Sequence, residues 1–432
     1  YALRRSRNRP DGTAMNLPGT RHGARSWAFY DWANSAFATV VLAGFFPLMF
    51  QDYWSQDVSA SIANLRLGWA NAAASLLIIF IAPLAGSMAY RLGAHKRLLL
   101  GFAALGVLGT ISLSAVDAGH WQLAALLFVL ASLGFLGGNI FYDALLVHVA
   151  PRAEWDALSG LGFGLGYLGG GLLYLGCVVA VLNPAWLGLT SVADAVLLSF
   201  VLTGVWWAVF SLPLAFNVTE PDRQAVGESA LAGGMQQLWD TVKHIRQYRE
   251  VWVFLLAYWL YIDALGTTIR MAVAYGRSLG FPQESLIVAL LITQFVGFPA
   301  AIAMGWLGTR IGARQGILLG IGVYLIICTW GAFIQAPWEF YAIAALVGLV
   351  QGGVQSLSRS YYAKLIPAHR AGEFFGFYNL LGKFAALMGP PLFGLFGVWF
   401  GDVRYSMLAL ILMFVVGAIV LMRVERQGAT AW

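Results

Sequence analysis

The chain has 432 residues, of which 59% are hydrophobic and 11% charged, and its mean hydropathy is +0.73. This composition excludes an ordinary soluble domain, in which about 25% of residues are charged. The formal net charge of +6 does not indicate nucleic-acid binding, because the basic residues follow the ends of apolar segments.

Twelve apolar stretches are each long enough to cross a bilayer as a helix, which takes about 20 residues. A β-barrel would instead show short segments of alternating polarity. We therefore predict an all-α integral membrane protein with twelve transmembrane helices in two pseudo-symmetric six-helix bundles. The predicted spans are 27–50, 67–90, 98–117, 121–150, 158–182, 195–216, 251–275, 284–307, 316–335, 338–362, 372–399 and 404–422.

These spans define the predicted domains. They are a cytoplasmic tail at 1–26, a first bundle at 27–216, a central cytoplasmic loop at 217–250, a second bundle at 251–422 and a cytoplasmic tail at 423–432. The central loop has one apolar helical face, which suggests an amphipathic helix on the membrane surface or a simple tether. With both termini cytoplasmic, 20 of the 26 Lys and Arg residues lie inside, which fits the positive-inside rule.

The first span carries polar residues near its inner end. Asn34 lies deep enough to be a candidate for a solute cavity. Asp31 lies nearer the cytoplasm, where it is either part of a gate or an interfacial cap favoured by the helix N-terminus.

The loops after the second and eighth spans share a pattern. The run GSMAYRLG at 86–93 matches GWLGTRIG at 305–312, so that Arg91 and Arg310 occupy equivalent positions. Internal repeats of this kind mark transporters whose two halves rock about a site near the middle of the membrane. Both arginines are candidates for a gate on the cytoplasmic side.

The fourth and tenth spans each present a polar stripe on one helical face. Asn139 and Asp143 are four residues apart, and Gln351, Gln355 and Arg359 repeat the same spacing. The two stripes are pseudo-symmetric counterparts. They line a solute path or join helices through hydrogen bonds. Asp143 and Arg359 lie toward the cytoplasmic ends and are candidates for an inner gate.

Two charges lie near the predicted middle of the membrane, Asp263 in the seventh span and Lys383 in the eleventh. A charge there costs about 2.5–3.5 kcal/mol on insertion scales, so each needs a compensating role. Either Asp263 takes a proton or a substrate amine, with Lys383 as its partner or as a carboxylate ligand, or the two form a structural ion pair. Arg270 lies two turns beyond Asp263, where it binds a substrate carboxylate or extends to the outer interface.

No enzyme motif accompanies these residues, and we expect neither a cofactor nor a metal site. The glycines Gly164, Gly166 and Gly169 formally match a dinucleotide fingerprint. They follow no strand, so this pattern indicates close helix packing instead.

Several longer runs resemble a known family. They are YDWANSAFAT at 30–39, GFGLGYLGGG at 162–171, GVWWAVFSLPL at 204–214, LAYWLYID at 256–263 and the run from LVQGGVQSLSRS through EFFGFYNLLGKFAA within 348–394. With the repeated loop, they resemble the major facilitator superfamily, in the branch of the fungal vacuolar amino-acid effluxer. The resemblance covers nearly all of 27–422. It departs from the superfamily at Tyr90 and Thr309, where the loop signature usually has an aspartate that helps to latch the bundles.

The resemblance implies a secondary transporter of the bacterial inner (cytoplasmic) membrane, with helices 1, 4, 7 and 10 around a central cavity. We expect proton-coupled efflux of amino acids or similar small zwitterions by a monomer. The expected partners are a small-molecule substrate, protons and membrane lipids, without nucleic acid. An exporter of drugs or lipids on the same fold is the alternative. A non-transporting scaffold or receptor is disfavoured, because no polar segment is long enough for a soluble domain.

Overall fold

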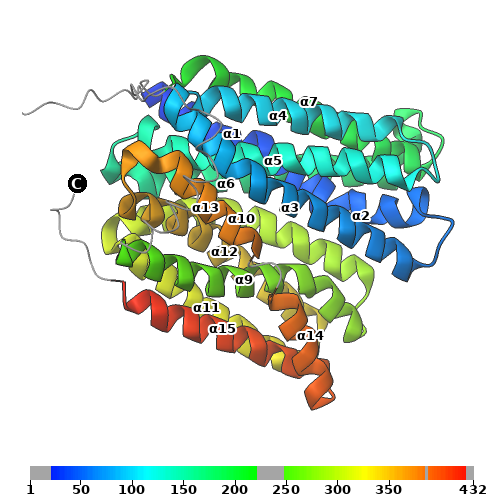
Figure 1. Cartoon of the computed structure of the whole chain (residues 1–432). Coiled ribbons are helices and arrows are strands. Elements are labelled where there is room, and N and C mark those ends of the chain that lie inside the picture. The colour runs from blue at the N-terminus through cyan, green and yellow to red at the C-terminus, as the bar shows by residue number, and fades with distance from the viewer. Residues whose placement is uncertain (1–20, 221–247, 385–387, 425–432) are drawn as a thin grey trace, which may run out of the picture.

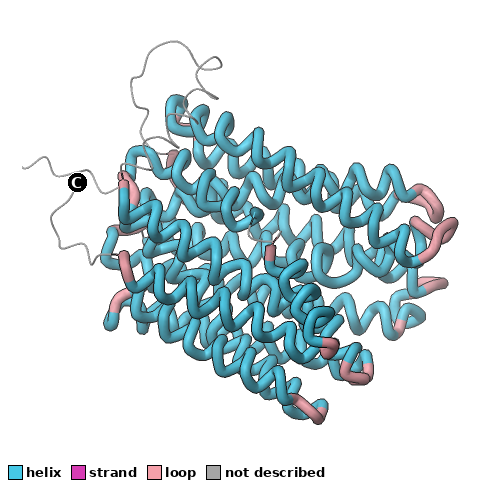
Figure 2. Tube along the Cα trace, turned by 60° about the horizontal axis from the view of Figure 1, so that its bottom comes forward, coloured by secondary structure: helices cyan, strands magenta, loops and turns pink. Residues whose placement is uncertain are grey.

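The computed structural model describes residues 21–220, 248–384 and 388–424, and every regular element in these ranges is a helix (Figure 1). The helices run side by side, and the loops that join them gather at the two ends of the molecule (Figure 2). α1 begins and α15 ends at the same end, on the left in Figure 1, which we call the terminal face. The amphipathic helix expected in the central loop lies outside the described residues.

The observed helices match the predicted spans in order. In the first half they are α1 (Arg21–Ala36), α2 (Phe46–Met49), α3 (Ala60–Leu92), α4 (His95–Ser112), α5 (Trp121–Val149), α6 (Trp155–Leu182) and α7 (Val192–Asn217). In the second half they are α9 (Arg249–Ser278), α10 (Gln283–Ile311), α11 (Ala313–Phe333), α12 (Pro337–Leu365), α13 (Ala371–Phe384), α14 (Gly389–Phe400) and α15 (Ser406–Met422).

Ten helical segments of the described chain are long and apolar enough to cross a membrane. Two shorter apolar helical stretches, Leu65–Ile81 in α3 and Gly389–Phe400, lie where the second and eleventh spans were predicted. The described part of the eleventh span forms two helices, α13 and α14. Prolines occupy the first turn of α14, where the missing N–H breaks no helical hydrogen bond.

The first span departs from a regular α-helix. π-helical segments at Phe37–Phe45 and Phe50–Trp54 lie on either side of the short α2. π-helical turns are rare and frequently occur at functional sites. The longer segment here begins one turn beyond Asn34, where the helix borders the cavity described below. No sequence pattern predicted this segment.

The repeated loop has the same conformational role in both halves. Gly93 follows the end of α3 with φ 59°, and Gly312 follows the end of α10 with φ 94°. A backbone with positive φ is readily adopted only by glycine, so the last glycine of each repeat ends its helix.

The first glycine of each repeat allows the two halves to touch. A Cβ atom on Gly86 of α3 would lie 3.1 Å from the carbonyl oxygen of Gly372 on α13. A Cβ atom on Gly305 of α10 would lie 2.8 Å from the carbonyl oxygen of Asp156 and 2.9 Å from the Cα of Gly160, both on α6. The repeat therefore encodes two pseudo-equivalent contacts between the halves, α3 with α13 and α10 with α6.

The helices form two groups that follow the halves of the sequence, α1–α7 mainly in the upper part of Figure 1 and α9–α15 mainly in the lower part, with α13 drawn level with α3 and α6. Contact between them runs mainly through α6 with α10 and α12, and through α13 with α3 and α5. This is the all-α arrangement of two six-helix bundles that the sequence predicted. The exact domain limits, including 217–250, stay a prediction.

Candidate solute cavity and the contacts that close it

A cavity of about 520 Å³ lies between the two halves. It is bordered by α1, α5 and α6 from the first half and by α9, α10, α12 and α13 from the second. Sites for small molecules usually occupy about 300–1,000 Å³, so the volume suits a small solute. The predicted site residues that line it are Asp31, Asn34, Asn139, Asp143, Arg270, Gln351, Gln355 and Arg359.

Arg359 of α12 projects across the boundary between the halves. Its side chain is 3% exposed, and its Nη1 lies 3.2 Å from Oδ1 of Asp143 on α5 and 3.6 Å from Oδ2 of Asp31 on α1. Its Nε donates to the hydroxyl of Ser159 at 2.8 Å, and its Nη2 donates to the carbonyl of Ser159 at 3.1 Å. One guanidinium from the second half is thus bound by three helices of the first.

The two carboxylates also accept hydrogen bonds from neutral groups. The hydroxyl of Tyr142 donates to Oδ2 of Asp31 at 2.8 Å, and the amide of Asn379 donates to Oδ2 of Asp143 at 2.9 Å. Asn379 belongs to α13, so this second bond also joins the halves. We call Asp31, Asp143 and Arg359 the charged floor of the cavity.

Aromatic rings surround the guanidinium of the charged floor. The Cζ of Arg359 lies 4.5 Å from the ring centroid of Phe163, 4.9 Å from that of Trp27 and 5.0 Å from that of Tyr142. Trp27 stacks on Tyr142 and donates its indole N–H to the backbone carbonyl of Tyr142 at 2.7 Å. Ring faces attract a cation, most strongly where water is absent, so these rings stabilise the guanidinium in its buried position.

A second set of contacts joins the halves nearer the terminal face. Lys364, in the last turn of α12, lies 2.5 Å from Oδ2 of Asp156 at the start of α6. Arg152 donates to the carbonyl of Lys364 at 2.8 Å, and the hydroxyl of Ser159 donates to the carbonyl of Ser356 at 2.8 Å. The polar contacts between the halves are therefore concentrated on the terminal-face side of the cavity.

Asp31 does not cap a helix, and that alternative is wrong. α1 begins at Arg21, which places Asp31 in the third turn, where it is buried at 8% exposure. Its partner from α12 explains why a carboxylate is tolerated there.

Asp263 is placed differently from the sequence-based expectation. Its side chain is 1% exposed and does not line the cavity, whereas Arg270 does. The Nη2 of Arg270 lies 3.7 Å from Oδ1 of Asp263, which also accepts a hydrogen bond from Thr267 at 3.4 Å. Arg270 therefore turns back along its own helix instead of extending to the outer interface. The side chain of Lys383 lies outside the described residues, so its pairing with Asp263 stays a prediction.

Arg310 of the repeated loop lies outside the charged floor. Arg310 is exposed, and its guanidinium stacks over the ring of Trp306 at 3.6 Å. The side chain of Arg91 lies outside the described residues. Their role as gate residues stays a prediction.

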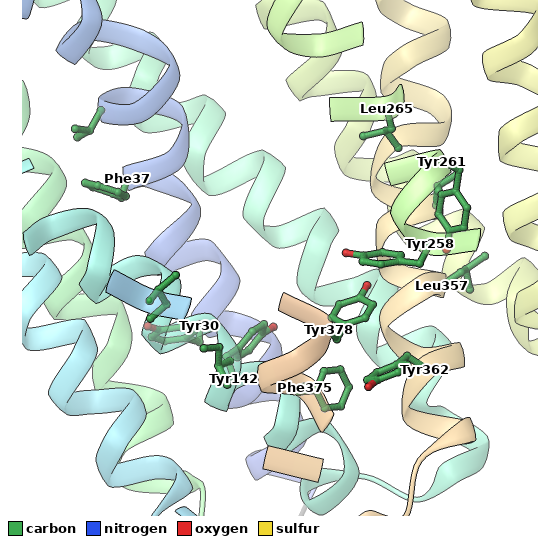
Figure 3. Packing of buried hydrophobic residues seen from close by; sticks show 14 of the residues in the cluster. Tyr30, Phe37, Tyr142, Tyr258, Tyr261, Leu265, Leu357, Tyr362, Phe375 and Tyr378 are labelled. Carbon is green, nitrogen blue, oxygen red and sulfur yellow. The ribbon is translucent and has the colours of Figure 1, made fainter. Parts of the chain in front are cut away.

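Amides and phenols form the rest of the polar lining. The amide of Asn34 donates to Oδ1 of Asn139 at 2.6 Å, which joins α1 to α5. Oε1 of Gln351 is buried and accepts no hydrogen bond from any described residue. Tyr258 and Tyr378 stack, with 4.2 Å between their ring centroids. Figure 3 shows these two side chains next to each other.

Sequence reasoning missed three polar residues of this region. Gln294 of α10 lines the cavity and donates to the hydroxyl of Thr39, in the π-helical segment Phe37–Phe45, at 2.9 Å, which bridges the halves. Asn379 and Ser159 bind the charged floor. Gln294 and Asn379 are amides inside predicted apolar spans, so the argument that selected Gln351 applied to them equally. Ser159 carried no such signal, because hydroxyls are common in membrane helices.

The all-helical fold, its two pseudo-symmetric halves and the polar cavity between them are those of a membrane transporter, and the relatives of this chain place it in the major facilitator superfamily, whose members are not enzymes. The solved structure of the Escherichia coli fucose:proton symporter FucP, in an outward conformation, has the same fold. It superposes with a TM-score of 0.69 at 14% identity and covers 94% of this chain and 99% of FucP.

Within that superfamily, residues 150–431 match the family model described as vacuole effluxer Atg22 like, and the chain belongs to this family. The chain is 37% identical to the MFS-type transporter YxiO of Bacillus subtilis, over 94% of this chain and 95% of YxiO. It is 26% identical to autophagy-related protein 22 of Coccidioides immitis over 66% of this chain. That match spans about half, 51%, of the fungal protein.

Proposed function

We propose that the protein is a secondary active transporter that moves amino acids or similar small zwitterions across the inner membrane by alternating access, coupled to protons and in the direction of efflux. The observation that carries this proposal is the cavity between the halves, which presents carboxylates, two guanidinium groups and amides to one volume. A zwitterion needs partners of both signs, and buried polar groups without partners are costly. The family's description as effluxers supports the direction.

The terminal face is proposed to be the cytoplasmic side. Most Lys and Arg residues lie at this end in the predicted topology, as the positive-inside rule requires. In alternating access the contacts of Arg359 and Lys364 then form the inner closure, and they break when the cavity opens to the cytoplasm. The loss of these contacts on the cytoplasmic side is balanced by contacts that form where the halves close on the opposite side.

Arg270 is the proposed ligand for the solute carboxylate. Its side chain is 44% exposed and borders the cavity, and its ion pair with Asp263 holds the guanidinium beside Gly266. A guanidinium binds a carboxylate through two parallel hydrogen bonds, which gives direction as well as charge. Asp263 acts here as a positioning residue, because it contacts Arg270 and does not border the cavity.

The test is counterflow in proteoliposomes loaded with a mixture of the twenty amino acids and read by mass spectrometry. We expect selective exchange of a few species, reduced at least tenfold in Arg270→Gln. Arg97→Gln is the matched control, because it removes an exposed arginine that does not line the cavity and pairs with Glu220 of its own half. No exchange from folded wild-type protein would exclude amino-acid transport.

Export of drugs or lipids is the second candidate, because rings such as Phe135, Phe163 and Tyr258 also border the cavity. A cavity that binds lipophilic solutes through rings does not need the Arg270–Asp263 pair. Efflux of a lipophilic dye that persists in Asp263→Asn and Arg270→Gln, without amino-acid counterflow in the wild type, would favour this candidate.

A further inference from the structure

We propose that Asp31 and Asp143 together hold one exchangeable positive charge, either a proton or the ammonium group of the solute, so that the two exclude each other at the charged floor. The proposal rests on the proposed transport function and adds the site at which proton and solute are coupled. It moves that site from Asp263, which does not border the cavity, to a pair of carboxylates that do.

The first argument is the balance of charge. Among the described residues, the floor contains two carboxylates and one guanidinium, which leaves one surplus negative charge. Asp31 is 8% exposed, Asp143 is 7% exposed and Arg359 is 3% exposed. An uncompensated charge at such burial is costly, and the cost disappears when a cation binds or a carboxylate takes up a proton.

The second argument is the geometry of the guanidinium. Its Nε and Nη2 are both directed at Ser159, so only Nη1 lies between the carboxylates, at 3.2 Å and 3.6 Å. Neither Asp31 nor Asp143 has the paired, two-bond contact that arginine can offer a carboxylate. The other donors to the pair, Tyr142 and Asn379, are neutral. Because a carboxylate has about four acceptor positions, both can accept a further donor from the cavity.

The third argument is the set of groups around the pair. Arg359 of α12 is the cation of the floor within the described residues, and the other titratable neighbours are phenols, which are neutral at physiological pH. These phenols are Tyr30 of α1, Tyr142 of α5, Tyr167 of α6, Tyr258 of α9 and Tyr378 of α13. Lys383 lies one turn beyond Asn379 on α13, and its side chain is outside the described residues, so the test below includes it.

The arrangement also couples the exchange to the opening of the cavity. Both carboxylates belong to the first half of the chain and Arg359 belongs to the second. Separation of the halves at the terminal face removes the guanidinium and leaves both carboxylates without their cation. A proton or an ammonium group that takes its place stabilises the open conformation, and by linkage opening strengthens the binding of either one. A transporter with neither bound stays closed, which prevents leakage.

The first experiment detects the proton without any solute. Infrared difference spectra of the purified full chain in nanodiscs, recorded across a pH titration, are expected to show the band of one protonated carboxyl group. The band is expected to be lost in Asp31→Asn and in Asp143→Asn. Asp156→Asn is the matched control, because it removes a buried carboxylate that has a cation of its own, Lys364, and it is expected to keep the band.

The second experiment tests exchange with an ammonium group. A mixture of the twenty amino acids is expected to remove the band and release one proton per transporter, whereas the same mixture with acetylated amines is expected to do neither. Below the pH at which the site takes up its proton, the apparent affinity for the amino acids is expected to fall about tenfold for each unit by which the pH is lowered, because the proton and the ammonium group compete. If Asp31→Asn or Asp143→Asn still binds solute but releases no proton, the variant is folded, and the loss of proton release is not due to misfolding.

Each outcome decides a part of the proposal. Absence of the band in the wild type, or its survival in both aspartate variants, overturns the proton site whatever the solute is. A band that is absent in the wild type and appears in Lys383→Met shows that Lys383 balances the surplus charge, and also overturns it. If the band is present but amino-acid counterflow is absent, the proposed solute fails and the proton site stands. Counterflow without proton release overturns the proposed replacement of the proton by the ammonium group.

Discussion

Replacement of Arg359 by glutamine tests whether the charged floor holds the two halves together at the terminal face. The variant keeps a polar side chain with hydrogen-bond donors, though a shorter one, and removes the charge that lies between Asp31 and Asp143. These partners come from the other half of the chain, so the interaction exists only while the halves are closed. The loss of stability therefore falls on the closed conformation.

The magnitude follows from burial and from the number of contacts. Arg359 is 3% exposed, and it loses two ion pairs and part of its hydrogen bonding to Ser159. Removal of one partner from a buried ion pair costs about 3–5 kcal/mol. Since about 1.4 kcal/mol corresponds to a tenfold change in an equilibrium, the ratio of open to closed molecules is expected to rise by about a hundredfold or more.

The assay is a distance distribution between two spin labels across the terminal face. Labels on Glu154→Cys and Ala368→Cys occupy exposed positions in the connections after α5 and α12, one in each half. The native cysteines Cys177 and Cys328 are buried and are replaced by alanine. The wild type is expected to give mainly the short distance of the closed conformation, and the variant a longer distance that becomes dominant.

Arg97→Gln is the control, since Arg97 lies near the start of α4 at the same face, is exposed and pairs with Glu220 of its own half. It is expected to leave the distance distribution unchanged. An Arg359→Gln distribution equal to that of the wild type would refute the reasoning, because a buried guanidinium that joins three helices of the other half would then contribute nothing to closure.

Three further predictions follow from individual contacts. Gly160→Ala is expected to lower the melting temperature by the equivalent of about 1–3 kcal/mol, because its Cβ would lie 2.7 Å from backbone atoms of α10, whereas Gly176→Ala, with no atom within 4 Å, is expected to change little. Lys364→Met is expected to favour the open spin-label distance, and the double variant with Asp156→Asn is expected to show less than the sum of the two effects. Tyr142→Phe removes a hydrogen bond between two helices of the first half but keeps the ring, and about 1.5–3 kcal/mol of the free energy of unfolding is expected to be lost, read as a lower melting temperature.

Distinct results contradict each of these predictions. Equal melting temperatures for the two glycine variants would show that α6 and α10 can separate slightly without loss. Additive effects of Lys364→Met and Asp156→Asn would show that the two side chains do not interact. An unchanged melting temperature in Tyr142→Phe would show that Asp31 finds another donor at no cost.

Hydropathy and helical spacing predicted much of the candidate site. Asp143 and Arg359 were selected because polar residues four apart form one face of a helix, and both line the cavity. The sequence also indicates that a charge at Asp263 is energetically costly. It does not predict that Arg270 pairs with Asp263, because helix spacing gives the face on which Arg270 lies but not whether its flexible side chain turns back along the helix.

The contact between α12 and α1 had no sequence signal. Asp31 and Arg359 lie in the first and tenth spans, and whether they meet depends on how far the two halves have closed. The helix that carries Asp31 starts earlier than expected, which changed a supposed cap into a buried charge. The sequence also did not predict the π-helical segment Phe37–Phe45, because in an apolar span the composition of a π-helix does not differ from that of an α-helix.

The sequence by itself determined that the chain is helical, spans the membrane and has two related halves. It did so because a lipid environment leaves the backbone no other hydrogen-bonding solution, and because the glycine pattern of one loop occurs twice. Only the tertiary structure decided which charges pair. Arg359 pairs with two carboxylates of the other half, whereas Asp263 pairs with an arginine of its own helix. Pairing depends on the approach of helices far apart in sequence, and local spacing carries no information about that approach.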